Sequence, residues 1–264
     1  MILLSFDIEE FDMPMEYGKS IPFEEQISIS KAGTTAILDL LDVHQIKATF
    51  FSTVVFAKNA PDIIKRIIAS GHELASHTYF HSDFKVAHLK MSKDELEQLS
   101  QSEVIGFRMP RMYPVDEMEI FKAGYQYNSS INPTFLPGRY NHLDKPRTYF
   151  MQSDVLQIPA SVSPMIRFPL FWLSFHNLPL FIYIFLSKIT LKKDKYLNIY
   201  FHPWEFTDLD QPKKFNFPGY VSKNTGAKMI ARFDQFIVQM KQKNYIFGTF
   251  KEFITTIDAN TISN

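Results

Sequence analysis

Ionisable side chains follow several short apolar segments of this sequence, and their types suit metal-assisted hydrolysis. Asp7 and Glu9 end the apolar run 2–6, and His77 and His81 follow another short run. Histidines and carboxylates are the ligands of hydrolytic metal sites that keep one position open. Such an ion acidifies a water molecule, a carboxylate can accept its proton, and a histidine can return a proton to the leaving group. These residue types therefore point to hydrolytic chemistry.

Neither pair is specific when it is considered alone. Acids after a strand often cap a helix or lie in a solvated loop, and H-x-x-x-H is common on helix surfaces. Strand alternation places Asp7 and Glu9 on one side and Ile8 and Glu10 on the other, so the first two form a pair. One helical turn would bring the two histidines onto one face. Because both pairs follow predicted strands, a shared divalent ion is favoured.

Arg108 and His202 follow two further predicted strands. The carboxyl ends of parallel strands meet at one rim, so these side chains should join the same site. Taken alone, Arg108 fits a surface salt bridge equally well, and His202 fits a half-buried structural histidine slightly better. The remaining histidines considered lack an acidic or histidine partner at metal spacing and are expected to be structural or solvated: His44, His72, His88 and His142.

Hydrophobic periodicity predicts alternating strands and helices along the chain. Strand–helix alternation indicates a mostly parallel sheet or barrel in a single domain over residues 1–264. The loops 10–30, 132–152 and 205–225 are long enough to form the walls of a cleft. Strands are expected near 2–6, 47–53, 72–77, 104–108, 127–131, 155–159, 197–202 and 245–250, and helices near 31–44, 62–71, 91–99, 115–123 and 226–243, with a short helix at the end.

Composition excludes several classes of protein. The chain has 264 residues, of which 45% are hydrophobic, so disorder over most of it is excluded. Lys and Arg number 28, as do Asp and Glu, and this neutral balance argues against a nucleic-acid partner. Without cysteine, any metal must be held by histidines and carboxylates. No pattern indicates an oligomeric state.

Residues 168–187 carry no charge over nearly the length of a membrane-spanning helix. Two prolines and a His-Asn pair interrupt them, so we expect an apolar insertion near 165–190 that lies against the barrel and does not span a bilayer. Phe171 and Trp172 are its candidate membrane-facing residues for peripheral contact. No secretory signal is visible, and a cytoplasmic location, peripheral to the inner face of the membrane, is expected.

Four segments in this order resemble the motifs of the polysaccharide deacetylases, the family four carbohydrate esterases with NodB homology. The resemblance covers roughly residues 2–250 and implies a distorted (β/α) barrel with fewer than eight strands. It also implies zinc or a similar divalent ion held by Asp-His-His, and hydrolysis of acetyl groups on N-acetylated sugars of a polysaccharide or its lipid-linked precursor. The segments are SFDIEE (5–10), SHTYFH (76–81), GFRMP (106–110) and IYFHPWE (199–205).

The family's metal-binding aspartate of the first motif falls on Ile8, which cannot ligate. One branch that resembles this chain more closely spaces its acids as Asp-x-Asp or Asp-x-Glu. The resemblance then implies Asp7 as the catalytic base and a metal held by Glu9, His77 and His81. A competing assignment puts Asp7 itself on the metal.

The other motif residues receive roles from the same resemblance. Arg108 matches the arginine that orients the base, and His202 matches the general acid. Arg111 stands where the family often has tyrosine, at a position whose backbone N–H helps to form the oxyanion hole, and Trp204 extends the last motif, so both are expected to bind substrate. The stretch 154–161 only loosely resembles the fourth motif, which leaves open the residue that tunes His202.

Two alternatives remain at this point. An allantoinase-like hydrolase of cyclic amides shares the fold and fits an altered first motif. A catalytically inactive carbohydrate-binding barrel follows if Ile8 means that the metal is lost. Histidine with carboxylate suits zinc, cobalt, nickel or iron, so the sequence does not select the ion.

Overall fold

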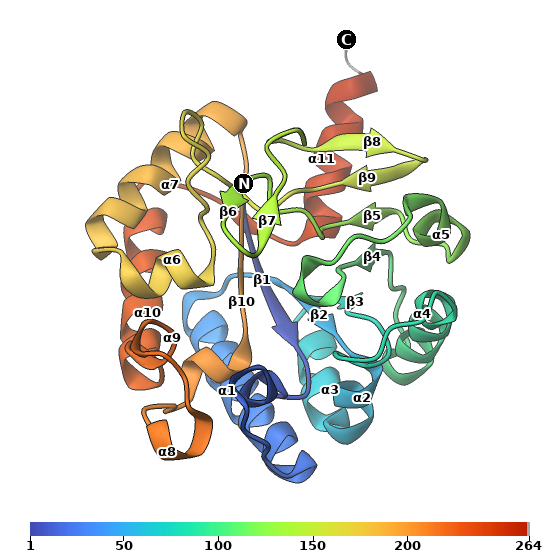
Figure 1. Cartoon of the computed structure of the whole chain (residues 1–264). Helices are drawn as coiled ribbons and strands as arrows, with labels where there is room; N and C mark the ends of the chain where they lie inside the picture. The colour runs from blue at the N-terminus through green and yellow to red at the C-terminus, as the bar shows by residue number, and fades with distance from the viewer. Residues whose placement is uncertain (263–264) are drawn as a thin grey trace.

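A curled sheet of mostly parallel strands forms the centre of the molecule (Figure 1). The computed structural model describes residues 1–262. The strands of the main sheet are β1 (Ile2–Ile8), β2 (Thr49–Ser52), β3 (Glu73–Ser76), β4 (Gly106–Phe107), β5 (Tyr127–Asn128), β8 (Phe150–Gln152), β9 (Val155–Gln157), β10 (Leu197–Phe201) and β11 (Phe247–Gly248). A separate two-stranded hairpin contains β6 (Phe135–Leu136) and β7 (Tyr140–Asn141).

Seven strands, within residues 1–262, form a continuous parallel wall in the order β10-β1-β2-β3-β4-β5-β9. Strand β8 adds to it by pairing antiparallel with β9, and β11 pairs parallel with β1 over two residues. The ring closes beyond β9, where the Ser161 N–H donates to the Asn198 carbonyl at 2.9 Å and the Asn198 N–H donates to the Ser161 hydroxyl at 2.8 Å. The expected distorted (β/α) barrel is confirmed, but its main sheet has nine strands within the described residues, where fewer than eight were expected, because β8 and β11 add to the seven-stranded parallel wall.

Helices surround the outside of the sheet (Figure 1). The periodic helices expected from the sequence are present, and the first begins eight residues earlier than expected, at Phe23, after Pro22. The helices are α1 (Phe23–His44), α2 (Val54–Asn59), α3 (Pro61–Ala69), α4 (Ala87–Ser100), α5 (Glu117–Lys122), α6 (Trp172–Asn177), α7 (Leu180–Asp194), α8 (Pro212–Phe215), α9 (Gly219–Ser222), α10 (Ala227–Lys241) and α11 (Phe250–Ile262), with 3-10 turns η1 (Met13–Tyr17), η2 (Pro110–Met112) and η3 (Pro203–Phe206).

Alternation along β1 separates two apolar cores. The even-numbered residues of this strand belong to the larger core, which packs against the helices. Leu3 points to the other face and lies in a second cluster with Phe51 of β2. Phe250 and Phe253 of α11 belong to that second cluster as well. The amino-terminal end of the barrel is therefore filled by apolar side chains, and the polar site lies at the opposite rim.

The apolar run 168–187 does not form one helix. It contains α6 and the first half of α7, and within residues 1–262 no helix is long and apolar enough to cross a membrane. Phe171 and Trp172 are 5% and 7% exposed, so their expected membrane-facing position is wrong. They pack inward because α6 lies against the barrel rim, and the exposed aromatic residues of this segment are Phe181 and Phe185.

Helix α1 supports two segments of the rim at once. The Ser30 hydroxyl donates to the Glu9 carbonyl at 2.5 Å. Gly33 lies so close to η3 that a Cβ there would stand 1.9 Å from the carbonyl oxygen of Pro203. Because Pro203 directly follows His202, this close approach fixes the position of a predicted catalytic residue.

We expect Gly33→Ala to destabilise the protein, because the added methyl group overlaps backbone atoms that cannot rotate away. Overpacking of this kind costs ~1–3 kcal/mol. The measurement is the free energy of unfolding in urea. Gly219→Ala is the matched control, since nothing lies within 4 Å of the added Cβ. Equal stability of the two variants would contradict the close contact between α1 and η3.

Candidate metal and catalytic site

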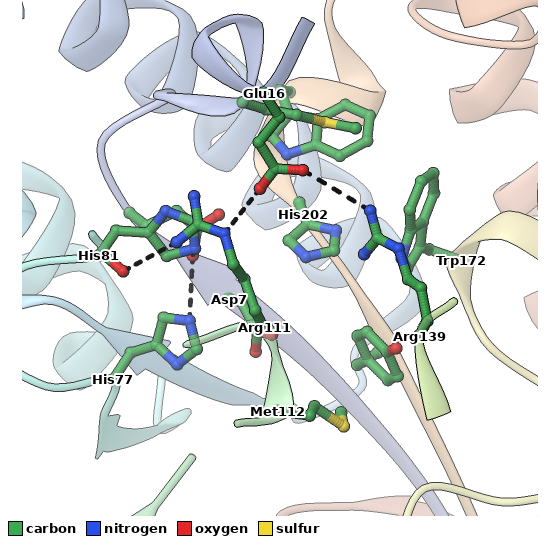
Figure 2. Close-up of a pocket in the computed structure, with 13 residues that line it drawn as sticks. Asp7, Glu16, His77, His81, Arg111, Met112, Arg139, Trp172 and His202 are labelled. Carbon is green, nitrogen blue, oxygen red and sulfur yellow. Dashed lines mark hydrogen bonds and ion pairs between the residues drawn. The ribbon is translucent and has the colours of Figure 1, made fainter. Parts of the chain in front are cut away.

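The predicted site residues line one pocket at the carboxyl-terminal rim of the barrel, except for Arg108, which is fully buried behind Asp7 (Figure 2). Its volume of about 60 Å³ leaves room for a few water molecules or a small acyl group. The pocket is lined by Asp7, Glu9, Met13, Glu16, His77, His81, Arg111, Met112, Arg139, Trp172, Tyr200, His202 and Trp204.

Glu9, His77 and His81 form a compact cluster on one side of this pocket. Glu9 Oε2 lies 3.0 Å from His77 Nε2 and 3.2 Å from His81 Nε2. The three donor atoms lie within 4.8 Å of one another. The two histidines lie on a loop after β3, where Thr78 has a φ of 66°, and not on the helical turn expected from their spacing. The loop nevertheless brings both rings to the same carboxylate.

The second nitrogen of each ring fixes which atom faces the cluster. His77 Nδ1 lies 2.8 Å from the Arg108 carbonyl, and His81 Nδ1 lies 2.6 Å from Asp12 Oδ1. Both acceptors require a proton on Nδ1, which leaves the lone pair of each Nε2 directed toward Glu9. Among the described residues, no hydrogen-bond donor reaches Glu9 Oε2. Three converging lone pairs without a proton between them fit a divalent cation.

The pKa values of these groups are consistent with a cation site. Burial lowers the pKa of His77 to about 4, so its ring is neutral near pH 7, as a metal ligand must be. Burial also raises the pKa of Glu9 to about 7. A buried carboxylate with this shift lacks sufficient compensating positive charge, and a bound cation would supply it.

Asp7 lies beside this cluster and forms a fully buried ion pair with Arg108. Arg108 Nη1 donates to Asp7 Oδ1 at 2.6 Å and to the Ser5 hydroxyl at 2.9 Å. Arg108 Nε and Nη2 donate to the Ser129 carbonyl and hydroxyl, both at 3.0 Å. Burial raises the pKa of Asp7, but Arg108 outweighs this effect and holds the pKa below its usual value. The carboxyl group is therefore ionised and fixed in orientation.

His202 lies across the pocket from the histidine cluster (Figure 2). Its Nδ1 is 3.0 Å from Glu205 Oε1, which also accepts the His202 backbone N–H at 2.6 Å. The indole of Trp204 stacks on the imidazole at a centroid distance of 5.2 Å and is 2% exposed. Trp204 thus supports His202 and has almost no open face on which a sugar could stack.

Arg111 spans the mouth of the pocket and connects three segments (Figure 2). Its Nε lies 2.6 Å from Glu16, and its Nη1 donates to the His81 carbonyl at 3.1 Å. Its Nη2 lies 3.4 Å from Asp12. The backbone of Arg111 is left-handed, with φ of 55°, in the turn predicted to contribute to the oxyanion hole. Its side chain therefore also orders the loop that carries His81.

Several polar residues of the site were not predicted from the sequence. Glu205 is the partner of His202, and Asp12 is the partner of His81. Glu10 accepts the His81 backbone N–H at 2.8 Å. The three-residue spacing of His202 and Glu205 could have indicated a hydrogen bond across the turn. The contact of Asp12 with a residue 69 positions away had no such signal.

Comparisons with known proteins agree with this geometry. Residues 2–126 match the family model for polysaccharide deacetylase. A chitooligosaccharide deacetylase from Bradyrhizobium sp. (strain ANU 289) is 36% identical over 81 residues, which cover 31% of this chain and 36% of that protein. The peptidoglycan-N-acetylmuramic acid deacetylase PdaA from Bacillus subtilis (strain 168) is 34% identical over 68 residues, or 26% of each chain. These alignments span only about a quarter to a third of the relatives' length.

Solved structures share the fold over most of the chain. A probable polysaccharide deacetylase from Pseudomonas aeruginosa PAO1 superposes with a TM-score of 0.65 at 15% identity, covering 96% of this chain and 88% of that one. A Puue allantoinase superposes with a TM-score of 0.63 at 15% identity, covering 95% and 87%. At this level of identity the likeness concerns the fold alone.

The fold and the site together define a (β/α) barrel with its candidate functional residues at the carboxyl ends of the strands. The family model covers the part of the chain that contains the first three motifs, and over these residues the chain is similar to the polysaccharide deacetylases.

We expect metal occupancy to depend on the histidine cluster. His77→Ala or Glu9→Gln removes one of three protein ligands and should leave too few to retain a divalent ion. Elemental analysis of protein purified without chelator measures the occupancy. His44→Ala is the control, because His44 pairs with Asp234 outside the pocket. Full metal content in His77→Ala would show that the cluster does not hold the ion.

Proposed function

We propose that this protein is a metal-dependent hydrolase that removes acetyl groups from N-acetylated sugars of a polysaccharide or its lipid-linked precursor. The observation that carries the proposal is that a candidate cation site, a candidate proton acceptor and a candidate proton donor surround one small pocket. The Glu9 cluster could hold a cation, the Asp7–Arg108 pair could accept a proton, and the His202–Glu205 pair could donate one.

Asp7 is the proposed general base. A divalent cation in the Glu9 cluster, with zinc the first candidate, would acidify water and polarise the acetyl carbonyl. Asp7 takes the proton as the water oxygen attacks the carbonyl carbon. Arg108 holds the carboxylate ionised through one oxygen. This ion pair supports Asp7 as the base and Glu9 as the metal ligand, the first of the two assignments considered from the sequence.

His202 is the proposed general acid. The carbon–nitrogen bond breaks as its imidazolium gives a proton to the sugar nitrogen, which releases acetate and a free amine. Burial lowers the pKa of His202, but the surrounding carboxylates, Glu205 foremost, outweigh this and raise the pKa above its usual value. The ring is thereby kept protonated to higher pH, as a general acid requires. The backbone N–H at Arg111 is the proposed donor to the developing oxyanion.

The size of the pocket supports an acetyl substrate. A cavity of about 60 Å³ admits a small acyl group and leaves the sugar at the rim. Arg111 and Arg139 border that rim and are the charged groups that a sugar would meet, whereas Trp172 is 7% exposed and only lines the wall of the pocket. The two relatives described above are named for chitooligosaccharides and for peptidoglycan, both of which carry N-acetyl groups.

The alternatives have less support in this geometry. An inactive barrel was suggested by Ile8, but Ile8 packs in the larger core and Glu9 supplies the carboxylate instead. The allantoinase-like alternative rests on the fold alone. Release of acetate from a glycan and ring opening of a cyclic amide are separate assays, so the two hydrolase activities can be distinguished directly.

We expect Asp7→Asn to retain the metal and to lower kcat for acetate release from an N-acetylated chitooligosaccharide by ~10²–10⁴-fold, the usual range for loss of a general base. Removal of the metal with a chelator should abolish the same activity, and zinc should restore it. Glu9→Gln should instead lose the metal. If Asp7→Asn loses the metal and Glu9→Gln keeps it, the two roles are exchanged.

We further propose that α7 contacts an anionic lipid surface. Phe181, Phe185 and Ile189 recur every four residues on its outer side and are 72%, 61% and 40% exposed. Lys192 and Lys193 lie in its last turn. An exposed apolar stripe with neighbouring lysines is the composition of helices that lie in the headgroup region of anionic membranes.

The inner side of α7 supports the same proposal. Tyr183, Ser187 and Thr190 turn hydroxyl groups into the protein, and among the described residues these oxygens have no hydrogen-bond partner. The inner side of the helix also buries Ile184 and Leu191, so α7 presents large apolar side chains on both sides, unlike an ordinary surface helix. Such an outer face is best explained by an apolar partner.

We expect the double variant Phe181→Ser/Phe185→Ser to bind vesicles containing anionic phospholipid at least about tenfold more weakly, because the apolar contact is lost. Vesicle sedimentation measures the binding. Met118→Ser/Phe121→Ser on α5 is the matched control, with side chains 42% and 45% exposed. Absence of wild-type binding, or equal loss in both double variants, would rule out contact through α7.

A further inference from the structure

A second buried histidine contacts the carboxylate that holds His202. His176 Nε2 lies 2.7 Å from Glu205 Oε2, and both side chains are fully buried. The other oxygen, Glu205 Oε1, accepts from His202 Nδ1 and from the His202 backbone N–H. One carboxylate thus joins two imidazoles in a row that runs from the core to the pocket.

The hydrogen bonds determine the protonation of this row. His202 Nδ1 and His176 Nε2 must each carry a proton, because a carboxylate can only accept. His176 Nδ1 is buried and has no hydrogen-bond partner among the described residues. A single proton on Nε2, directed at Glu205, is therefore the form of His176 that the surroundings favour.

His176 is held in place by several contacts of α6. Its ring meets the edge of Trp172 at a centroid distance of 5.8 Å, and its carbonyl accepts a hydrogen bond from the side chain of Asn224. Arg232 Nε donates to the carbonyl of Phe175, the preceding residue, at 2.7 Å. The ring therefore cannot turn away from Glu205 without loss of packing on both sides.

We infer that His176 and Glu205 are positioning residues that orient His202 as the general acid, and that the apolar insertion supplies part of the catalytic machinery through α6. This inference rests on the proposed function. His176 satisfies the distal oxygen of Glu205 and keeps the carboxylate ionised and immobile. Glu205 fixes the proton on His202 Nδ1 and directs Nε2 toward the pocket, where it meets the leaving nitrogen.

Several ionisable groups near His202 influence its pKa. Burial of Glu205 raises its pKa, but the hydrogen bonds from His176 and His202 outweigh this and keep the pKa low. A carboxylate that is ionised throughout the working range raises the pKa of its imidazole partner. Glu205 of η3 faces His202, with His176 behind it. The other titratable or charged groups that face it are Asp7 and Glu9 from β1 and its end, His77 and His81 after β3, Tyr200 of β10, and Glu16, Arg111 and Arg139 across the pocket.

The first experiment compares two leaving groups. An N-acetylated chitooligosaccharide requires protonation of its departing amine, whereas 4-nitrophenyl acetate releases a phenolate that needs no proton. We expect His176→Phe to lower kcat on the oligosaccharide by ~10–100-fold, the usual effect of losing a second partner of a catalytic histidine. Its kcat on the aryl ester should change less than about twofold, with KM and metal content unchanged. His176→Gln keeps an N–H donor and should recover part of the loss.

Asn177→Ala is the matched control on the same helix. Asn177 Nδ2 donates to the carbonyls of Leu173 and Tyr220 and has no contact with Glu205, so this variant tests simple loosening of α6. In a His202→Ala background, His176→Phe should have no further effect on kcat, because it acts through His202. Equal losses on both substrates, or a full additional loss in that background, would overturn the inference.

The second experiment compares a direct titration of His202 with the pH dependence of turnover. The pKa of His202, measured by NMR on the imidazole nitrogens, should fall in Glu205→Gln, and the alkaline limb of kcat should move to lower pH by the same shift. An unchanged pKa would overturn the inference.

The two proposals fail in different ways. If the wild-type protein with its metal releases no acetate from the oligosaccharide, the proposed function fails. If the wild-type protein is active but His176→Phe behaves like Asn177→Ala, only the positioning role is refuted.

Discussion

The buried ion pair between Asp7 and Arg108 is the interaction on which the rest of the site depends. Arg108 enters the barrel from β4 and donates to Ser5, Asp7 and Ser129, so one guanidinium joins strands that are far apart in the sequence. The central carbon of this guanidinium lies 4.0 Å from the ring centroid of Phe51. Loss of one partner of a buried pair costs ~3–5 kcal/mol, because an uncompensated charge remains inside. The Asp7–Arg108 pair therefore contributes both to the candidate site and to the stability of the barrel.

This pair also separates the two halves of the proposed chemistry. On one side, the Arg108 carbonyl accepts from His77 Nδ1 and so orients a ligand of the candidate metal centre. On the other side, the Asp7 carboxylate contributes to the field that raises the pKa of His202. A change at Arg108 would therefore affect the base, the metal ligand and the acid together, and would not report on any one of them separately.

The two helices of the apolar insertion lie in different surroundings. Helix α6 faces the barrel, where Trp172 borders the pocket and His176 reaches Glu205. Helix α7 presents Phe181 and Phe185 outward. The two helices are joined by a short turn, and α7 leads away from the rim toward the start of β10, at the amino-terminal end of the barrel.

The sequence by itself determined the alternation of strands and helices, the order of the motifs and the residue types at the rim. These follow from local patterns: period-two and period-3.6 hydrophobicity place polar residues at strand ends, and β1 alternation pairs Asp7 with Glu9. Only the tertiary structure decided which partners those residues meet. The His77–His81 loop, the Asp12 contact and the reach of His176 to Glu205 depend on segments brought together by barrel closure, and their hydrogen bonds join residues too distant in the chain for any local pattern to specify.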